Sequence, residues 1–111
     1  MNKHIPPAFP DKEKLRASLA LMRALAHPLR LNILNLIDTH KEVIVGDIYK
    51  TLNIEQALAS QQLRILRQVE LVHTRRDQKF VFYRINYGKI AVASAVINPL
   101  ANMVVGQQPT K

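Results

Sequence analysis

The sequence predicts a mainly helical fold with one small β-hairpin, and three observations support this prediction. The chain has 111 residues, which is enough for one domain and too few for two. Apolar residues recur at helical spacing in several separate segments. Residues 80–86 instead alternate in the way of a half-buried strand, with Phe80, Phe82 and Arg84 on one side and Val81, Tyr83 and Ile85 on the other.

The first half of the chain predicts two amphipathic helices behind a flexible arm. Residues 1–10 hold three of the six prolines, so no regular structure is expected there. Asp11 is a suitable N-cap for a helix that runs to about Ala26. Pro28 suits the first position of a second helix, which we expect to end near Asp38. The apolar stripe of this second helix is Leu29, Ile33, Leu34 and Ile37.

The second half predicts two further helices, a hairpin and a last helix. The expected elements are a small strand at 43–45, helices at 47–52 and 55–69, strands at 71–76 and 80–86, and a helix at 88–105. We expect residues 106–111 to be a flexible tail, so that one domain is expected to span 11–105. Two helices around a short turn, followed by a β-hairpin, are the plan of a winged helix-turn-helix.

The charge of the chain favours a polyanionic partner. Sixteen Lys and Arg residues against eight Asp and Glu give a net charge of +8 and a pI near 10.2. Residues 61–89 hold seven basic and two acidic residues, so much of the excess lies in about a quarter of the chain. A basic protein without an anionic partner remains the alternative when charge alone is considered.

The predicted helix at 55–69 has two faces of opposite character. Its inner face consists of Leu58, Ala59, Leu63, Ile65, Leu66 and Val69. Its outer face consists of Gln56, Ala57, Ser60, Gln61, Arg64, Arg67 and Gln68. Amides, a hydroxyl and guanidinium groups are the groups that read base edges in the major groove, and the outer face carries no acid. A solvated helix is the alternative, but such helices usually pair Glu with Lys four residues apart.

Basic residues near this helix are expected to add contacts to DNA. Arg75, Arg76, Gln78 and Lys79 are placed at or next to the tip of the predicted hairpin. A basic tip beside a recognition helix can reach the adjacent minor groove or the phosphate backbone. Lys50, at the end of the preceding helix, is expected to hold a further phosphate.

Several of these segments resemble the ArsR/SmtB regulators. They include Leu25-Ala26-x-Pro28-x-Arg30-x-x-Ile33-Leu34, the segment EVIVGDIYKTLNI, Ser60-Gln61-x-Leu63-x-x-Leu66-Arg67 and the wing RRDQKFVFYRI. The resemblance covers roughly residues 15–105. It implies a winged-helix dimer that represses by occupying operator DNA, with the first and last helices at the dimer interface. Three positions depart from the family: Glu55 opens the recognition helix, Glu70 follows it where Gly is common, and Asp77 lies in the wing.

The last helix is expected to support dimerisation, because it is apolar on nearly every side. A helix of this kind must be buried all round, and in so short a chain a second copy can supply part of the cover. A helix buried only within its own chain is the alternative. The predicted interface consists of Leu15, Leu19, Met22, Ile90, Ala93, Ile97, Leu100, Met103 and Val104.

The resemblance implies two possible metal-sensing sites, and both are expected to be empty here. One site uses a Cys-x-Cys pair at the third helix; this chain has no Cys, and the matching positions are Ile44 and Gly46, beside the lone carboxylate of Asp47. The other site uses His and acidic residues on the last helix, but residues 88–111 contain no His, Asp or Glu, and the four His of the chain are scattered. We therefore expect no metal and no cofactor, and leave open an effector of unknown chemistry or a small apolar ligand between the dimer helices.

The sequence thus predicts a transcriptional regulator that acts as a homodimeric repressor on an inverted-repeat operator in double-stranded DNA. A cytoplasmic location is expected, because no secretory leader or membrane span is recognisable. A winged helix that binds only proteins is the alternative function. An enzyme is not expected, because no nucleophile, base and acid occur together in a recognisable pattern.

Overall fold

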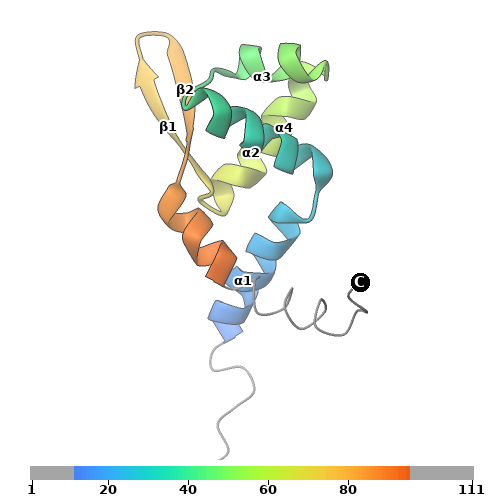
Figure 1. Cartoon of the computed structure of the whole chain (residues 1–111), viewed down its shortest axis with the longest axis vertical. Helices are drawn as coiled ribbons and strands as arrows, with labels where there is room; N and C mark the ends of the chain where they lie inside the picture. The colour runs from blue at the N-terminus through green and yellow to red at the C-terminus, as the bar shows by residue number, and fades with distance from the viewer. Residues whose placement is uncertain (1–11, 96–111) are drawn as a thin grey trace, which may run out of the picture.

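The computed structural model describes residues 12–95 and confirms the winged helix-turn-helix. Its labelled elements are α1 (Lys12–Leu25), α2 (Pro28–His40), α3 (Val45–Leu52), α4 (Gln56–Gln68), β1 (Val72–Asp77) and β2 (Phe80–Ile85). Residues 87–95 are also helical and begin the predicted last helix. Figure 1 shows α2, α3 and α4 packed together, with the β1–β2 hairpin, the wing, standing beside them.

The predicted element bounds are close to the observed ones, with two differences. α2 continues to His40 and ends at Lys41, whose φ of 72° lies outside the helical region. The predicted strand at 43–45 is reduced to Val43, which exchanges two backbone hydrogen bonds with Tyr83 of β2. Val45 instead belongs to the first turn of α3.

The core lies where α2, α3, α4 and the hairpin meet. Its largest fully buried side chains are Ile33, Ile37, Ile48, Leu63, Leu66 and Leu71. Burial of such side chains is the main source of stability in a domain of this size. The predicted inner face of α4 is correct for Ala59, Leu63 and Leu66, but Leu58 is 37% exposed. The neighbouring Ala59 is fully buried, so Leu58 lies at the edge of the buried face of α4.

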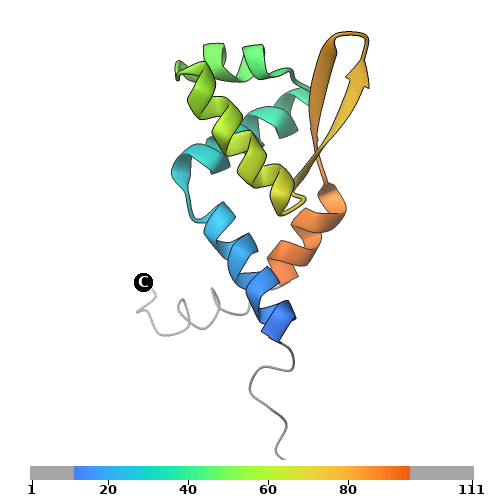
Figure 2. The same cartoon turned by 180° about the vertical axis from the view of Figure 1, so that it is seen from behind.

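α1 and the helix at 87–95 form a base at the opposite end from α3 and the wing tip. Figures 1 and 2 show these two helices side by side from both directions. Leu21 and Ala24 of α1 are buried, and so is Ala93, at 1% exposure. Ala93 was predicted at the dimer interface, but its own chain already covers it. The predicted interface residues Ile97, Leu100, Met103 and Val104, the arm at 1–10 and the tail at 106–111 lie outside the described residues.

The turn after α4 directs the chain into the wing. Leu71 N–H donates to the Leu66 carbonyl and Glu70 N–H to the Arg67 carbonyl, which is the Schellman pattern of a helix end. Glu70 sits at the left-handed position of this motif, with φ at 62°. This is the position where the sequence departs from Gly, and a residue with a Cβ is strained there. Asn86 Nδ2 donates to the Glu70 carbonyl and ties the end of the wing to the same turn.

Candidate DNA-binding surface

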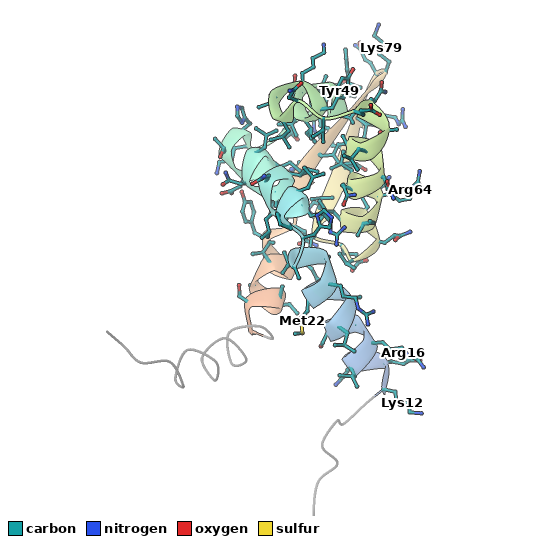
Figure 3. The ribbon with its side chains drawn as sticks, turned by 90° about the vertical axis from the view of Figure 1, so that its right-hand side faces the viewer. Lys12, Arg16, Met22, Tyr49, Arg64 and Lys79 are labelled. Carbon is teal, nitrogen blue, oxygen red and sulfur yellow. The ribbon has the colours of Figure 1, made fainter. Side chains whose placement is uncertain are left out.

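The outer face of α4 is exposed as predicted. Every residue of the predicted outer face lies at the surface, whereas Ala59, Gln62, Leu63 and Leu66 are buried beneath it. Arg64 projects away from the body of the molecule in Figure 3. Within residues 12–95, neither Arg64 nor Arg67 has a hydrogen bond or an ion pair to another side chain. Both guanidinium groups therefore keep their full hydrogen-bonding capacity for a ligand.

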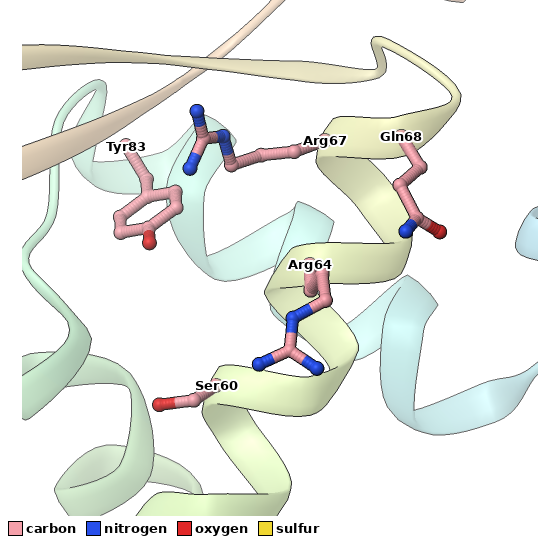
Figure 4. Close-up of a pocket in the computed structure, with 5 residues that line it drawn as sticks. All are labelled: Ser60, Arg64, Arg67, Gln68 and Tyr83. Atoms are coloured by element: carbon pink, nitrogen blue, oxygen red, sulfur yellow. The ribbon is translucent and has the colours of Figure 1, made fainter.

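An open, polar pocket lies between this face and the wing. It measures about 440 Å³ and is lined by Ser60, Arg64, Arg67, Gln68 and Tyr83. Figure 4 shows Arg67 and Tyr83 facing each other across it. The lining carries two guanidinium groups and no carboxylate, so it suits an anionic group. Tyr83 was not predicted as a site residue, because strand alternation places it on the same side as Val81 and Ile85.

The recognition-helix segment also contains a polar residue that points inward. Gln62 is 5% exposed and accepts a hydrogen bond of 2.8 Å from Arg30 Nη1 of α2. Gln62 belongs to neither of the two faces predicted for this helix. The signal that could have found it is Arg30, which belongs to the family-like motif and lies among apolar residues.

Arg75, predicted to contact DNA, is bound in the structure by a carboxylate of its own chain. Arg75 Nε and Nη2 donate to the two carboxylate oxygens of Glu42 at 2.9 and 2.8 Å, and its guanidinium lies 4.6 Å from the centroid of the Phe82 ring. The hydrogen bonds from Arg75 lower the pKa of Glu42, and the same bonds raise the pKa of Arg75. Arg84 Nε is 3.7 Å from the same carboxylate. A phosphate at Arg75 would therefore compete with Glu42 for the Nε and Nη2 donors.

The wing tip itself consists of residues after Arg75. Asp77 pairs with Phe80 across the hairpin, so Gln78 and Lys79 form the turn. Lys79, Arg76 and Gln78 are exposed as predicted, and Lys79 marks one end of the molecule in Figure 3. Phe80 is 44% exposed beside Lys79, an apolar feature of the tip that the sequence analysis left out. Lys50 is exposed on α3.

Comparison with known proteins identifies the family. Residues 27–74 match the family model described as "Bacterial regulatory protein, arsR family". The biofilm growth-associated repressor of Xylella fastidiosa is 34% identical over 99 residues, which cover 88% of this chain and 83% of that protein. The chain belongs to the ArsR family. It is therefore a DNA-binding transcriptional regulator and not an enzyme.

Other transcriptional regulators resemble this chain over most of its length. The transcriptional activator HlyU of Vibrio cholerae is 30% identical, with 88% of this chain and 91% of HlyU covered. A homodimeric winged helix-turn-helix DNA-binding domain from Mycobacterium bovis is 26% identical and has a TM-score of 0.66, covering 95% of this chain and 99% of that one. Close relatives thus include a repressor and an activator.

Two departures from the ArsR pattern are visible at α4 and α3. Glu55 is the N-cap of α4 in an extended conformation, and its side chain makes no capping hydrogen bond. At the start of α3, Ile44 and Gly46, which the resemblance aligns with a pair of metal-binding Cys, have no ligand atom in their side chains. Within residues 12–95, no three His, Cys, Asp or Glu side chains gather into a group that could hold a metal ion. In the same residues, no helix is long and apolar enough to cross a membrane.

Proposed function

We propose that this ArsR-family chain is a homodimeric repressor that occupies an inverted-repeat operator. The observation that carries the proposal is the acid-free outer face of α4, on which Arg64 and Arg67 have no side-chain partner among residues 12–95. A face of this composition suits the major groove, where Gln reads adenine and Arg reads guanine. The similarity to a repressor from Xylella fastidiosa supports repression, and the similarity to a homodimeric domain from Mycobacterium bovis supports the homodimer.

The roles of the individual residues follow from their position. Gln56, Ala57, Ser60, Gln61 and Arg64 read bases from α4, and Arg67 binds a phosphate at the pocket beside Tyr83. Arg76, Gln78 and Lys79 contact the adjacent groove or backbone from the wing, and Lys50 holds a phosphate from α3. Arg75 orders the wing instead of binding DNA, because Glu42 accepts hydrogen bonds from both its Nε and its Nη2.

The dimer is proposed to form at the base of the molecule. Leu19 of α1 is 38% exposed and Val92 of the helix at 87–95 is 51% exposed, while Leu15, Met22 and Ile90 are half-buried. Apolar side chains left open on two adjacent helices gain from cover by the same surface of a second copy. This arrangement leaves both α4 helices free to face one DNA duplex.

Release from DNA is proposed to need no metal. The chain has no Cys, and the described residues contain no cluster of metal-ligating side chains. Regulation then depends on another effector or on the amount of protein present. Because bacterial DNA lies in the cytoplasm, that is where we propose the protein acts.

The test is a binding titration on sequences selected from a random duplex pool, measured at several salt concentrations. Gln61→Ala and Arg64→Ala should lose sequence preference, whereas Arg76→Ala should weaken binding to all duplexes alike. Lys12→Ala removes the same charge at the far end of the molecule from Arg64 and serves as the control (Figure 3). If the wild-type protein binds no duplex at any salt concentration, the proposal is overturned and a protein-binding module is favoured.

A further inference from the structure

One guanidinium group joins three helices of the described structure. Arg30, in the first turn of α2, donates from Nε to the Ala24 carbonyl at 2.8 Å and from Nη2 to the Arg23 carbonyl at 3.0 Å, both in the last turn of α1. Its Nη1 donates to Oε1 of Gln62 in α4 at 2.8 Å. Arg30 therefore connects the end of the base helix to the middle of the recognition helix.

The placement of Arg30 opposes the electrostatics of its own helix. A cation in the first turn of a helix faces the positive end of the helix dipole, and α2 has no acid in that turn to offset it. The same cation is favourable at the end of α1, where the last carbonyl groups have no partner within the helix. Arg30 thus stabilises the contact between α1 and α4, although its charge is unfavourable at the start of α2.

Gln62 completes the connection from inside the recognition helix. It is the one buried polar residue found among residues 12–95, and it lies directly between Gln61 on the outer face and Leu63 in the core. A buried amide without a partner is costly, so its position is tied to that of Arg30. Any movement of α1 relative to α4 must stretch or break this set of hydrogen bonds.

Leu21 and Ala24 of α1 are buried in the core, but the contact between α1 and the end of α4 is open on one side. Ala17, Ala20 and Leu21 of α1 line a hollow of about 140 Å³ together with Gln68, Val69 and Glu70 at the end of α4 and Lys89. A hollow lacks the close packing that would fix the angle between two helices. The hydrogen bonds of Arg30 are directional and act at the point where α1 leaves the body of the domain.

We infer that Arg30 and Gln62 are positioning residues that set the spacing between the two half-sites of the operator. The inference rests on the proposed homodimer, in which α1 belongs to the interface and α4 to the DNA surface. The angle between these helices then sets the separation of the two α4 helices, which must match the helical repeat of DNA. Over a 14-residue helix, about 21 Å long, a tilt of about 10° displaces the far end by about 3.6 Å, close to one base-pair step.

The experiment measures binding to duplexes that carry two identical half-sites at centre-to-centre distances stepped by one base pair, together with a single half-site. Gln62→Met removes the side-chain oxygen that accepts from Arg30 and keeps a side chain of similar length, whereas Gln62→Glu retains that oxygen. Arg30→Lys keeps the charge and removes the guanidinium group with its three hydrogen-bonding nitrogens. Ile37→Val is the matched control, because it weakens the core of α2 and leaves the hydrogen bonds of Arg30 and Gln62 in place. Thermal unfolding of each variant verifies that stability losses are comparable.

Wild type should prefer one spacing over its neighbours by about ten-fold or more, because a shifted half-site loses base contacts. Gln62→Met and Arg30→Lys should reduce this preference to about three-fold or less while the single half-site is bound within about two-fold of wild type. Gln62→Glu should restore the preference, and Ile37→Val should keep it. Should Gln62→Met fail to fold, Arg30→Lys carries the same test.

Two outcomes separate the inference from the function on which it rests. If wild type selects no half-site pair at all, the proposed operator binding fails. If wild type selects a spacing, and Gln62→Met and Arg30→Lys both retain its full preference, the operator binding stands and the inference is overturned. A preference lost equally in Ile37→Val would also overturn it, because general destabilisation would then be sufficient.

Discussion

The outer face of α4 and the wing are both rich in arginine, but they use it differently. On α4, Arg64 and Arg67 project toward an open pocket and have no side-chain partner within residues 12–95. On the wing, Arg75 is bound by both oxygens of Glu42 and stacks over Phe82. Net charge alone therefore overstates the contribution of the wing to DNA binding, since part of its charge is neutralised within the protein.

The difference comes from how each element meets the rest of the chain. Arg64 and Arg67 lie one turn apart on a helix face that carries no acid. The wing is instead joined to the segment before α3, where Val43 pairs with Tyr83. This bridge brings Glu42 beside Arg75 and Arg84, although 33 positions separate Glu42 from Arg75.

Removing a free arginine should have the largest effect. Arg64→Ala is expected to lower affinity for the selected operator by about ten-fold or more, because a base or phosphate contact is lost at the centre of α4. Arg75→Ala should have a much smaller effect on operator affinity. Competition titrations with operator and scrambled duplexes measure both. Equal losses in the two variants would contradict the distinction between the two regions.

The turn at Glu70, which connects α4 to the wing, should give the next largest effect, on the stability of the fold. Glu70→Gly should stabilise the fold by about 1 kcal/mol, because Gly adopts the left-handed conformation without strain. For a domain of this size that corresponds to about 4–8 °C in Tm, measured by thermal unfolding. Asn53→Gly is the comparison, since Asn53 holds the same kind of position after α3 with φ at 55° and tolerates it better. A larger gain at Asn53 would contradict the explanation by strain.

Releasing the tethered arginine should have a smaller effect on DNA affinity. Glu42→Gln is expected to strengthen binding to duplexes of any sequence, because Arg75 and Arg84 lose their carboxylate partner. For each further phosphate neutralised, the salt dependence should steepen by about 0.9 in log–log slope. Binding to a scrambled duplex at stepped salt concentrations measures this. An unchanged slope would mean that the wing does not reach the backbone.

The smallest effect is expected from pH. The pKa of Glu42 is lowered in the folded protein, so its ion pair stabilises the fold fully above the ordinary value of 4.5. That contribution is lost as pH falls below 4.5 and through the lowered folded value. The difference in unfolding free energy between wild type and Glu42→Gln should therefore shrink in this window, as followed by denaturant titration. Arg64→Ala, whose side chain has no carboxylate partner in the described structure, should show no such convergence.

Much of the fold and of the α4 surface could be predicted, because both depend on local patterns. The helical spacing of apolar residues located α1, α2 and α4, and the alternation at residues 80–86 located β2. The residues that escaped prediction depend on distant parts of the chain. Glu42 reaches Arg75 only through the bridge between Val43 and β2, and Gln62 is buried because Arg30 of α2 lies against it.

By itself, the sequence determined the order of elements and the acid-free face of α4, because periodicity and residue type are properties of short segments. Only the tertiary structure decided which charged and polar groups are already satisfied. Arg30 and Gln62 are 32 positions apart, and their hydrogen bond exists because α2 packs across α4. The strength of such a contact depends on distance and burial, and no one-dimensional pattern records either of them.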